Sequence, residues 1–244
     1  MFNTILVHPL FNLLALIYAL VPGHDFGLAV IVLTALVRFA LWPVVTKQLH
    51  SQRAMQDLAP EVAKVRKQAK GDKQLESKLL MELYKEKEIS PFASLIPLIV
   101  QLPLLLALFV VLRDIVKPGE IAHLAYGPIK SLPAIKDVIA NSRAFKPTLF
   151  SAVNLDKPSI YLAAVAAGLQ YFQAKQLMPQ ANADPNAKAM MSITTIAFPL
   201  LTGVIALRLP AALPLYWVVT SAIAIWQQRL VLHRDAEELE AGTK

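Results

Sequence analysis

The chain has 244 residues, of which 56% are hydrophobic and only 17% charged, and its mean hydropathy is +0.50. A soluble domain carries about a quarter charged residues, so this composition excludes an ordinary soluble globular protein. The absence of cysteine excludes disulfides, thiolate metal sites and a cysteine nucleophile. The net charge of +7 would suit nucleic acid in a soluble protein. In a membrane protein it indicates basic cytoplasmic loops and contact with anionic lipid headgroups, so we expect no nucleic-acid recognition.

Residues 1–24 are apolar but are interrupted by polar residues and by Pro9. Two interpretations remain open for them, a helix that lies at the membrane surface and an extra span. Because Pro9 leaves only a short helix before the Pro-Gly pair at 22–23, we favour an extracytoplasmic interfacial helix.

Five later stretches are long and apolar enough to cross a bilayer, which takes roughly 20 residues of helix at about 1.5 Å each. They lack the alternation of a membrane β-barrel, and helices satisfy their own backbone hydrogen bonds in lipid. The sequence therefore predicts an all-α polytopic membrane protein with five transmembrane helices, at residues 25–47, 91–113, 159–178, 190–209 and 213–232.

The connecting segments differ in character. Residues 48–90 carry two apolar helical faces separated by Gly71-Asp72, with charged residues outward, which predicts a cytoplasmic helical hairpin. We expect an extracytoplasmic loop at 114–158 with a short helix near 135–140, a cytoplasmic loop at 179–189 and a cytoplasmic tail at 233–244. More basic residues fall on the hairpin side, which predicts the N-terminus outside and the C-terminus in the cytoplasm.

Arg38 is the most informative residue, because it puts a positive charge near the middle of the first predicted span. Burying a cation at that depth costs between about 2.5 and 17 kcal/mol. No Asp or Glu lies at membrane depth to pair with it. Either the side chain extends to the cytoplasmic headgroups, or it lies in a water-filled cavity. The cytoplasmic end of the span is roughly 12 Å away, a long reach for one side chain, so we favour the cavity.

Polar side chains at the same depth could line such a cavity. Thr34 and Trp42 flank Arg38 by one helical turn on the same face. Seven further polar residues lie in the other predicted spans, and each of them, taken singly, indicates an ordinary hydrogen bond between helices. Together with an unpaired arginine they predict a hydrophilic pocket; they are Gln101, Gln170, Gln173, Thr194, Thr195, Thr220 and Ser221.

The sequence contains no catalytic constellation. Its five histidines are scattered without metal-ligand spacing, and it has no glycine-rich phosphate loop. No carboxylate lies where a proton relay or a protease dyad would need one. We therefore expect neither enzyme activity nor a cofactor or metal.

Several segments resemble the YidC-type membrane protein insertases. The first span, FGLAVIVLTALVRFALWP at 26–43, has the family's arginine at Arg38, and SPFASLIPLIVQLPLLLALF at 90–109 is the most specific match. The hairpin at 58–85 also resembles the family's cytoplasmic hairpin. Further matches are PLFNLL at 9–14, AVAAGLQYFQAK at 164–175 and LPAALPLYWVVTSAIAIWQQ at 209–228.

The resemblance implies five helices around a hydrophilic groove that is open to cytoplasm and lipid. It assigns Arg38, Gln173 and Trp217 to this groove, and we add Thr34 and Gln101 from their positions. It also implies an insertase and chaperone for nascent membrane proteins in a bacterial inner membrane, working without nucleotide hydrolysis.

The resemblance names the Sec translocon and the ribosome as candidate partners, although the short acidic tail does not predict ribosome binding. One alternative is a small anion transporter or channel subunit in which Arg38 binds the solute. Another is a passive assembly chaperone.

Overall fold

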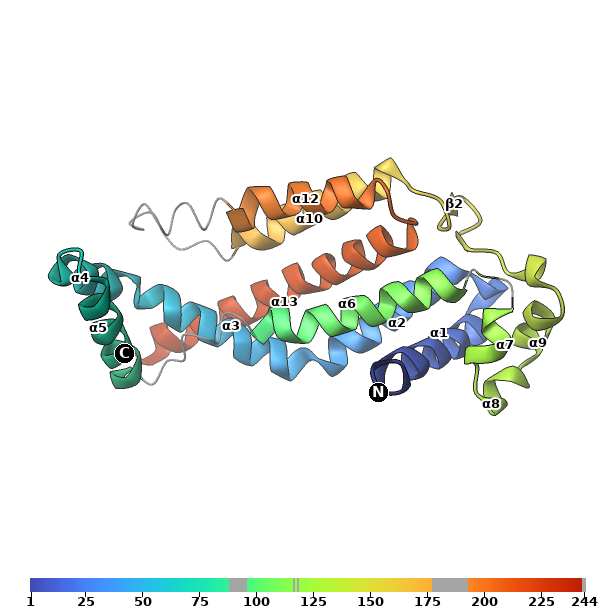
Figure 1. Cartoon of the computed structure of the whole chain (residues 1–244), viewed down its shortest axis with the longest axis horizontal. Helices are drawn as coiled ribbons and strands as arrows, with labels where there is room; N and C mark the ends of the chain where they lie inside the picture. Colours follow the sequence, from blue (N-terminus) through green and yellow to red (C-terminus); the bar gives the residue numbers. More distant parts are fainter. Residues whose placement is uncertain (88–95, 116, 118, 177–192, 243–244) are drawn as a thin grey trace.

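The computed structural model describes residues 1–87, 96–115, 117, 119–176 and 193–242. Helices make up nearly all of these residues, and the strands among them, β1 (Thr148–Leu149) and β2 (Val153–Asn154), form one antiparallel pair. The predicted all-α fold class is therefore confirmed. The molecule is elongated, with a helical hairpin at one end and a group of short helices at the other (Figure 1). We call these the hairpin end and the platform end.

The chain begins with one continuous helical stretch. A π-helix (Asn3–Val7) runs directly into α1 (His8–Leu20), so Pro9 lies inside a continuous helix and leaves one carbonyl of the preceding turn without its usual donor. The combined stretch Asn3–Leu20 has a mean hydropathy of 1.6 and is, within the described residues, a straight helix long and apolar enough to cross a membrane. Its location at the membrane surface stays a prediction.

The first predicted span is not one straight helix. α2 (Phe26–Ala40) and α3 (Trp42–Asp57) meet at Leu41 with a bend of 61°. Pro43 lies in the first turn of α3, has no N–H for the Phe39 carbonyl and clashes with a straight continuation. The apolar stretch expected to cross the membrane in a line therefore turns after fifteen residues of helix.

The hairpin end is built from α4 (Ala59–Ala69) and α5 (Lys73–Glu86), which pack against each other. Asp72 caps α5 by accepting hydrogen bonds from the backbone N–H groups of Gln74 and Leu75 at 2.9 and 3.1 Å. Ion pairs of 3.1 Å cross between the two helices, from Arg66 to Glu76 and from Lys87 to Glu61.

At the platform end, α6 (Ile96–Ile115) leads to four short helices: α7 (Glu120–Leu124), α8 (Gly127–Lys130), α9 (Pro133–Ala140) and a 3₁₀ turn, Ser142–Ala144. α9 lies where the sequence predicts a short helix. The buried side chain of Asn12 ties α1 to this group, because it donates to the Leu124 carbonyl at 3.0 Å and accepts from the Tyr126 N–H at 2.6 Å.

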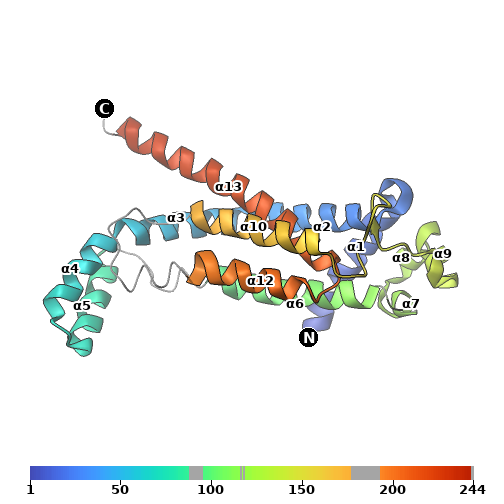
Figure 2. The same cartoon turned by 90° about the horizontal axis from the view of Figure 1, so that it is seen from above.

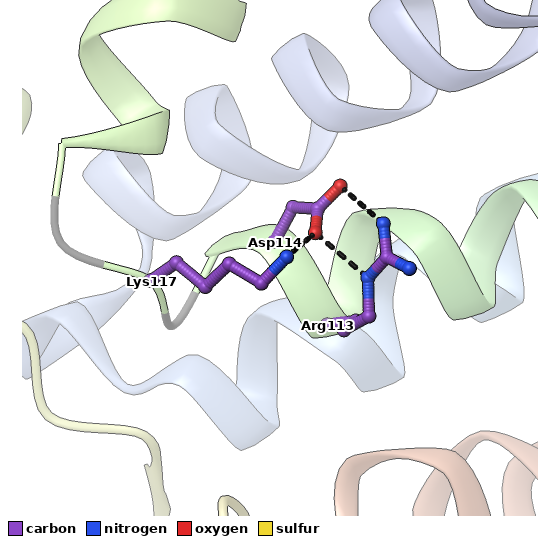
Figure 3. A network of polar contacts seen from close by, with 3 residues as sticks. All are labelled: Arg113, Asp114 and Lys117. Carbon is purple, nitrogen blue, oxygen red and sulfur yellow. Dashed lines mark hydrogen bonds and ion pairs between the residues drawn. The ribbon is translucent and has the colours of Figure 1, made fainter.

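The last turn of α6 carries a compact charge cluster beyond its apolar stretch (Figure 3). Asp114 accepts hydrogen bonds from Arg113 at 2.8 and 3.0 Å and from Lys117 at 2.6 Å. The hydrogen bonds from Arg113, aided by Lys117, hold the pKa of the Asp114 carboxyl below its usual value, although burial opposes them. A carboxylate at a helix C-terminus is otherwise unfavourable, and the two cations offset this.

The remaining helices are α10 (Ile160–Gln176), a π-helix (Ile193–Ala197) that continues into α12 (Phe198–Ala206), and the long α13 (Ala212–Gly242). α13 packs against both α2 and α10, and α12 packs against α10 (Figures 1 and 2). The buried residues of α10 and α12 are small or compact, namely Ala163 and Ala166 on α10 and Pro199, Thr202 and Ala206 on α12. Their large apolar side chains face outward, as lipid contact requires.

The first residues of α2, α10 and α13 all lie against one loop, residues 147–157. This loop includes the β-hairpin, and we call it the platform loop. Asp25 caps α2 by accepting from the Leu28 N–H at 2.8 Å, and it also accepts from the Phe150 N–H at 2.5 Å. The carbonyls of Leu155 and Lys157, just before α10, accept from the N–H groups of residues 212 and 211 at 3.1 and 3.0 Å. The starts of α2, α10 and α13 are thereby held at one level.

Gly27 allows the platform loop to approach α2. A Cβ at this position would lie 2.5 Å from Leu149 Cβ and 2.8 Å from Leu149 Cα. We expect Gly27→Ala to destabilise the fold by about 1–3 kcal/mol through overpacking. Gly168→Ala in α10 is the matched control, because its Cβ would meet no atom within 4 Å. That variant should gain up to about 1 kcal/mol of helix propensity. Thermal unfolding in detergent measures both, and equal shifts would contradict the close approach.

Candidate functional site

Arg38 lies in the last turn of α2, two residues before the bend. α2 ends at Ala40, whereas the predicted span continues to residue 47, so Arg38 lies nearer the end of its helix than expected. The side chain is half-buried and interacts electrostatically with the hydroxyl of Tyr216 on α13.

Tyr216 links three helices at this position. Its hydroxyl accepts a hydrogen bond of 2.6 Å from the side-chain amide of Gln101 on α6. Thr220, one turn further along α13, also faces the hydroxyl, but its own Oγ1 completes no hydrogen bond. Arg38, Gln101, Tyr216 and Thr220 thus form a polar group between α2, α6 and α13.

The structure brings only two of the five expected groove residues, Arg38 and Gln101, to this group. Thr34 is buried, and its hydroxyl donates to the Val30 carbonyl at 2.6 Å within its own helix. Trp217 is half-buried and packs against the hydrophobic core. Gln173 is half-buried on α10. A role in the groove stays a prediction for all five residues, Arg38 and Gln101 included.

Two residues that sequence reasoning did not single out matter here, Tyr216 and Gln227. Gln227 is fully buried on α13, and its Nε2 donates to the Trp42 carbonyl at 3.2 Å and to Thr46 Oγ1 at 3.3 Å. It therefore holds the bent segment against α13. The signal that could have found it is the change from apolar to polar residues at Trp-Gln-Gln-Arg, 226–229. Tyr216 lies in a purely apolar run beside Trp217 and gives no comparable signal.

Several buried side-chain oxygens of the membrane helices lack a hydrogen-bond partner. A buried polar atom without a partner is unfavourable, and water or a bound chain commonly satisfies it. Five such atoms lie on α10 and α13; they are Gln170 Oε1, Gln176 Oε1, Thr220 Oγ1, Gln227 Oε1 and Gln228 Oε1. Their number favours hydration along the buried faces of these helices.

The described residues contain no group of three or more His, Cys, Asp or Glu side chains that could hold a metal. A small cavity at the platform end is lined by residues of α7 and α9, among them Ile121 and Val138. None of the five expected groove residues lines it.

Residues 16–238 match the model of the family described as 60Kd inner membrane protein. The chain belongs to this family. The match includes α2, α6, α10 and α13, which carry the five expected groove residues. The predicted resemblance to YidC-type insertases is thereby confirmed, and the chain is a bacterial inner membrane protein.

Curated relatives cover most of the chain. "Membrane protein insertase YidC" of Fusobacterium nucleatum is 31% identical over 87% of this chain and 88% of the relative. "Membrane protein insertase YidC 2" of Bacillus anthracis is 30% identical over 98% of this chain and 84% of the relative. "Membrane protein insertase MisCA" of Bacillus subtilis is 28% identical over 98% and 83%.

The hydrogen bond between Gln101 and Tyr216 gives a testable prediction. Tyr216→Phe leaves the Gln101 amide without its acceptor, and an unpaired buried polar group costs about 1–3 kcal/mol. The apparent melting temperature in detergent should therefore fall. Tyr161→Phe is the control, because Tyr161 is 81% exposed and its hydroxyl has no bond within the described residues. An unchanged melting temperature in both variants would contradict a structural role for the Tyr216 hydroxyl.

Proposed function

We propose that this chain is a membrane protein insertase, which helps nascent proteins to enter and fold in the membrane without hydrolysing nucleotide. The observation that carries the proposal is the family match over residues 16–238, together with relatives named as insertases. The names of these relatives do not support the alternative of an anion transporter or channel subunit. Nothing is chemically transformed in this function, so the chain is not an enzyme and needs no cofactor.

The physical obstacle to insertion is the polar segment that a client must move across the bilayer. A polar group without a hydrogen-bond partner costs about 2–7 kcal/mol in an apolar medium. A hydrated recess part of the way across shortens the dry distance and lowers this barrier. The unpaired oxygens of Gln170, Thr220 and Gln228 support such a recess beside α10 and α13.

Arg38 gives the recess its preference for acidic segments. A carboxylate about 4 Å from the guanidinium gains about 4 kcal/mol at an effective dielectric constant near 20. The membrane potential adds about 2.3 kcal/mol per charge per 100 mV in the outward direction for an anion. In this proposal the client's acidic tail binds transiently at Arg38, while its apolar helix moves past the groove into lipid. Thr34, Gln101, Gln173 and Trp217 line this path.

The proposed orientation puts the N-terminus outside and the C-terminus in the cytoplasm, with the α4–α5 hairpin and residues 179–189 on the cytoplasmic side. The basic residues of the hairpin segment support this orientation. Clients therefore meet the groove from the cytoplasm. We further propose the Sec translocon, the ribosome and anionic headgroups as partners on that side.

The decisive variant is Arg38→Ala, tested on a client with an acidic translocated tail in reconstituted vesicles. We expect insertion to fall about tenfold, which corresponds to about 1.4 kcal/mol of lost stabilisation in the rate-limiting step. Arg38→Lys should largely retain insertion, because it keeps the charge. The readout is protease protection of the translocated tail.

Two controls separate the charge effect from misfolding. Arg208→Ala removes an exposed arginine that follows α12 and should leave insertion unchanged. A client whose tail is neutral should be inserted equally by the wild type and by Arg38→Ala. Equal insertion of the acidic client by these two proteins would refute the role of Arg38.

A further inference from the structure

Three aromatic side chains gather where α2 bends into α3. The rings of Phe39 and Trp42 stack with centroids 5.9 Å apart, and Trp226 of α13 meets Trp42 edge-on at 5.3 Å. Phe39 and Trp226 are nevertheless 51% and 52% exposed. The cluster is therefore ordered by its own contacts and still presents about half of two large rings to the surroundings.

A second aromatic pair lies on α10. Tyr171 and Phe172 pack edge to face with centroids 5.7 Å apart, and Phe172 is 58% exposed. The ammonium of Lys175 lies 6.0 Å from the Tyr171 ring centroid. Like the first cluster, this pair exposes aromatic surface, and it also has a cation next to it.

The two groups lie at one level because their helices start at the platform loop. Counting along each helix from its first residue, Phe39 is about 20 Å from Phe26, Phe172 about 18 Å from Ile160 and Trp226 about 21 Å from Ala212. α2, α10 and α13 all run from the platform end toward the hairpin end (Figure 1). The exposed rings therefore fall within about one helical turn, 5.4 Å, of one another.

Cations follow the aromatics on the hairpin side of each helix. Lys47, Lys175 and Arg229 are exposed, and no carboxylate of the described residues pairs with any of them. On α10 and α13 these are the first charged residues after an uncharged stretch that starts at the platform loop. Along these helices an apolar zone is followed by aromatic rings and then by cations without a carboxylate partner in the described part of the chain. The same order suits a path from the hydrocarbon core to anionic headgroups.

We propose that Phe39, Trp42, Tyr171, Phe172 and Trp226 form an aromatic belt that binds the headgroup boundary of one leaflet, with Lys47, Lys175 and Arg229 bound to anionic headgroups. The amphipathic tryptophan and tyrosine rings suit this boundary, which has one apolar and one wet side. The belt fixes the depth of the bent α2–α3 segment, and with it the depth of Arg38. In the proposed orientation the leaflet is the cytoplasmic one.

The test measures depth at single cysteines, which the cysteine-free chain makes possible without background labelling. Nitroxide labels go on Phe39→Cys, Phe172→Cys and Trp226→Cys in phosphatidylcholine vesicles with and without phosphatidylglycerol. Val165→Cys, also exposed on α10, and Ser151→Cys in the platform loop are the controls. Accessibility to oxygen and to a water-soluble nickel chelate reports depth.

We expect the three belt labels to share one depth at the headgroup boundary, within about one helical turn. The Val165 label should lie about 10 Å deeper, since it is seven residues earlier on α10. Belt depths that differ by more than two turns, or labels at the bilayer centre, would overturn the proposal. Labels that only the aqueous reagent reaches would also overturn it, and would indicate a surface for a protein partner.

Tryptophan fluorescence gives a second measurement that leaves Trp226 in place. The chain has three tryptophans, so the double variant Trp42→Phe, Trp217→Phe reports on Trp226 alone. Lipids brominated near the headgroup should quench its emission more strongly than lipids brominated near the chain ends. Phosphatidylglycerol should strengthen the quenching, and Arg229→Gln should remove that increase. The reverse depth order of quenching would overturn the proposal independently of the labels.

Discussion

The carboxylate of Asp25 makes two bonds on which the arrangement of the membrane helices depends. One oxygen caps α2, and the other accepts the Phe150 N–H of the platform loop. The far side of the same loop holds the first turn of α13 through the carbonyls of Leu155 and Lys157. Helices that are far apart in sequence thereby share a starting level. Since each residue advances a helix by about 1.5 Å, that level determines which side chains of α2, α10 and α13 face one another.

The bend after α2 creates the setting of Arg38. Pro43 leaves the Phe39 carbonyl without its usual donor, and a freed backbone group in lipid needs help from neighbouring helices. The Phe39 carbonyl accepts instead from the Leu41 N–H, and Gln227 donates next to the break to the Trp42 carbonyl. The end of α2 carries partial negative charge from its last carbonyls, which stabilises a cation in its last turn by about 0.3–2 kcal/mol. This offsets only part of the cost of placing a cation at membrane depth without a carboxylate partner among the described residues.

The sequence predicted the all-α class, the short helix α9 and the family, because hydrophobic run length and motif residues are local properties. It also identified Arg38 and Gln101, whose polarity stands out in apolar runs. It did not predict Tyr216 as the link between α6 and α13, since a tyrosine in an apolar run is compatible with any packed position. The π-helix before α1 and the sharp break at Leu41 depend on packing between helices and could not be read from proline positions alone. Pro103 shows this, because α6 continues through it.

The length of α13 has a mechanical consequence. Its 31 residues form one uninterrupted rod of about 46 Å, longer than the hydrocarbon thickness of about 30 Å. The rod packs mainly against α2 and α10. A tilt of about 10° at the platform loop would therefore move the C-terminal end of this rod by about 8 Å.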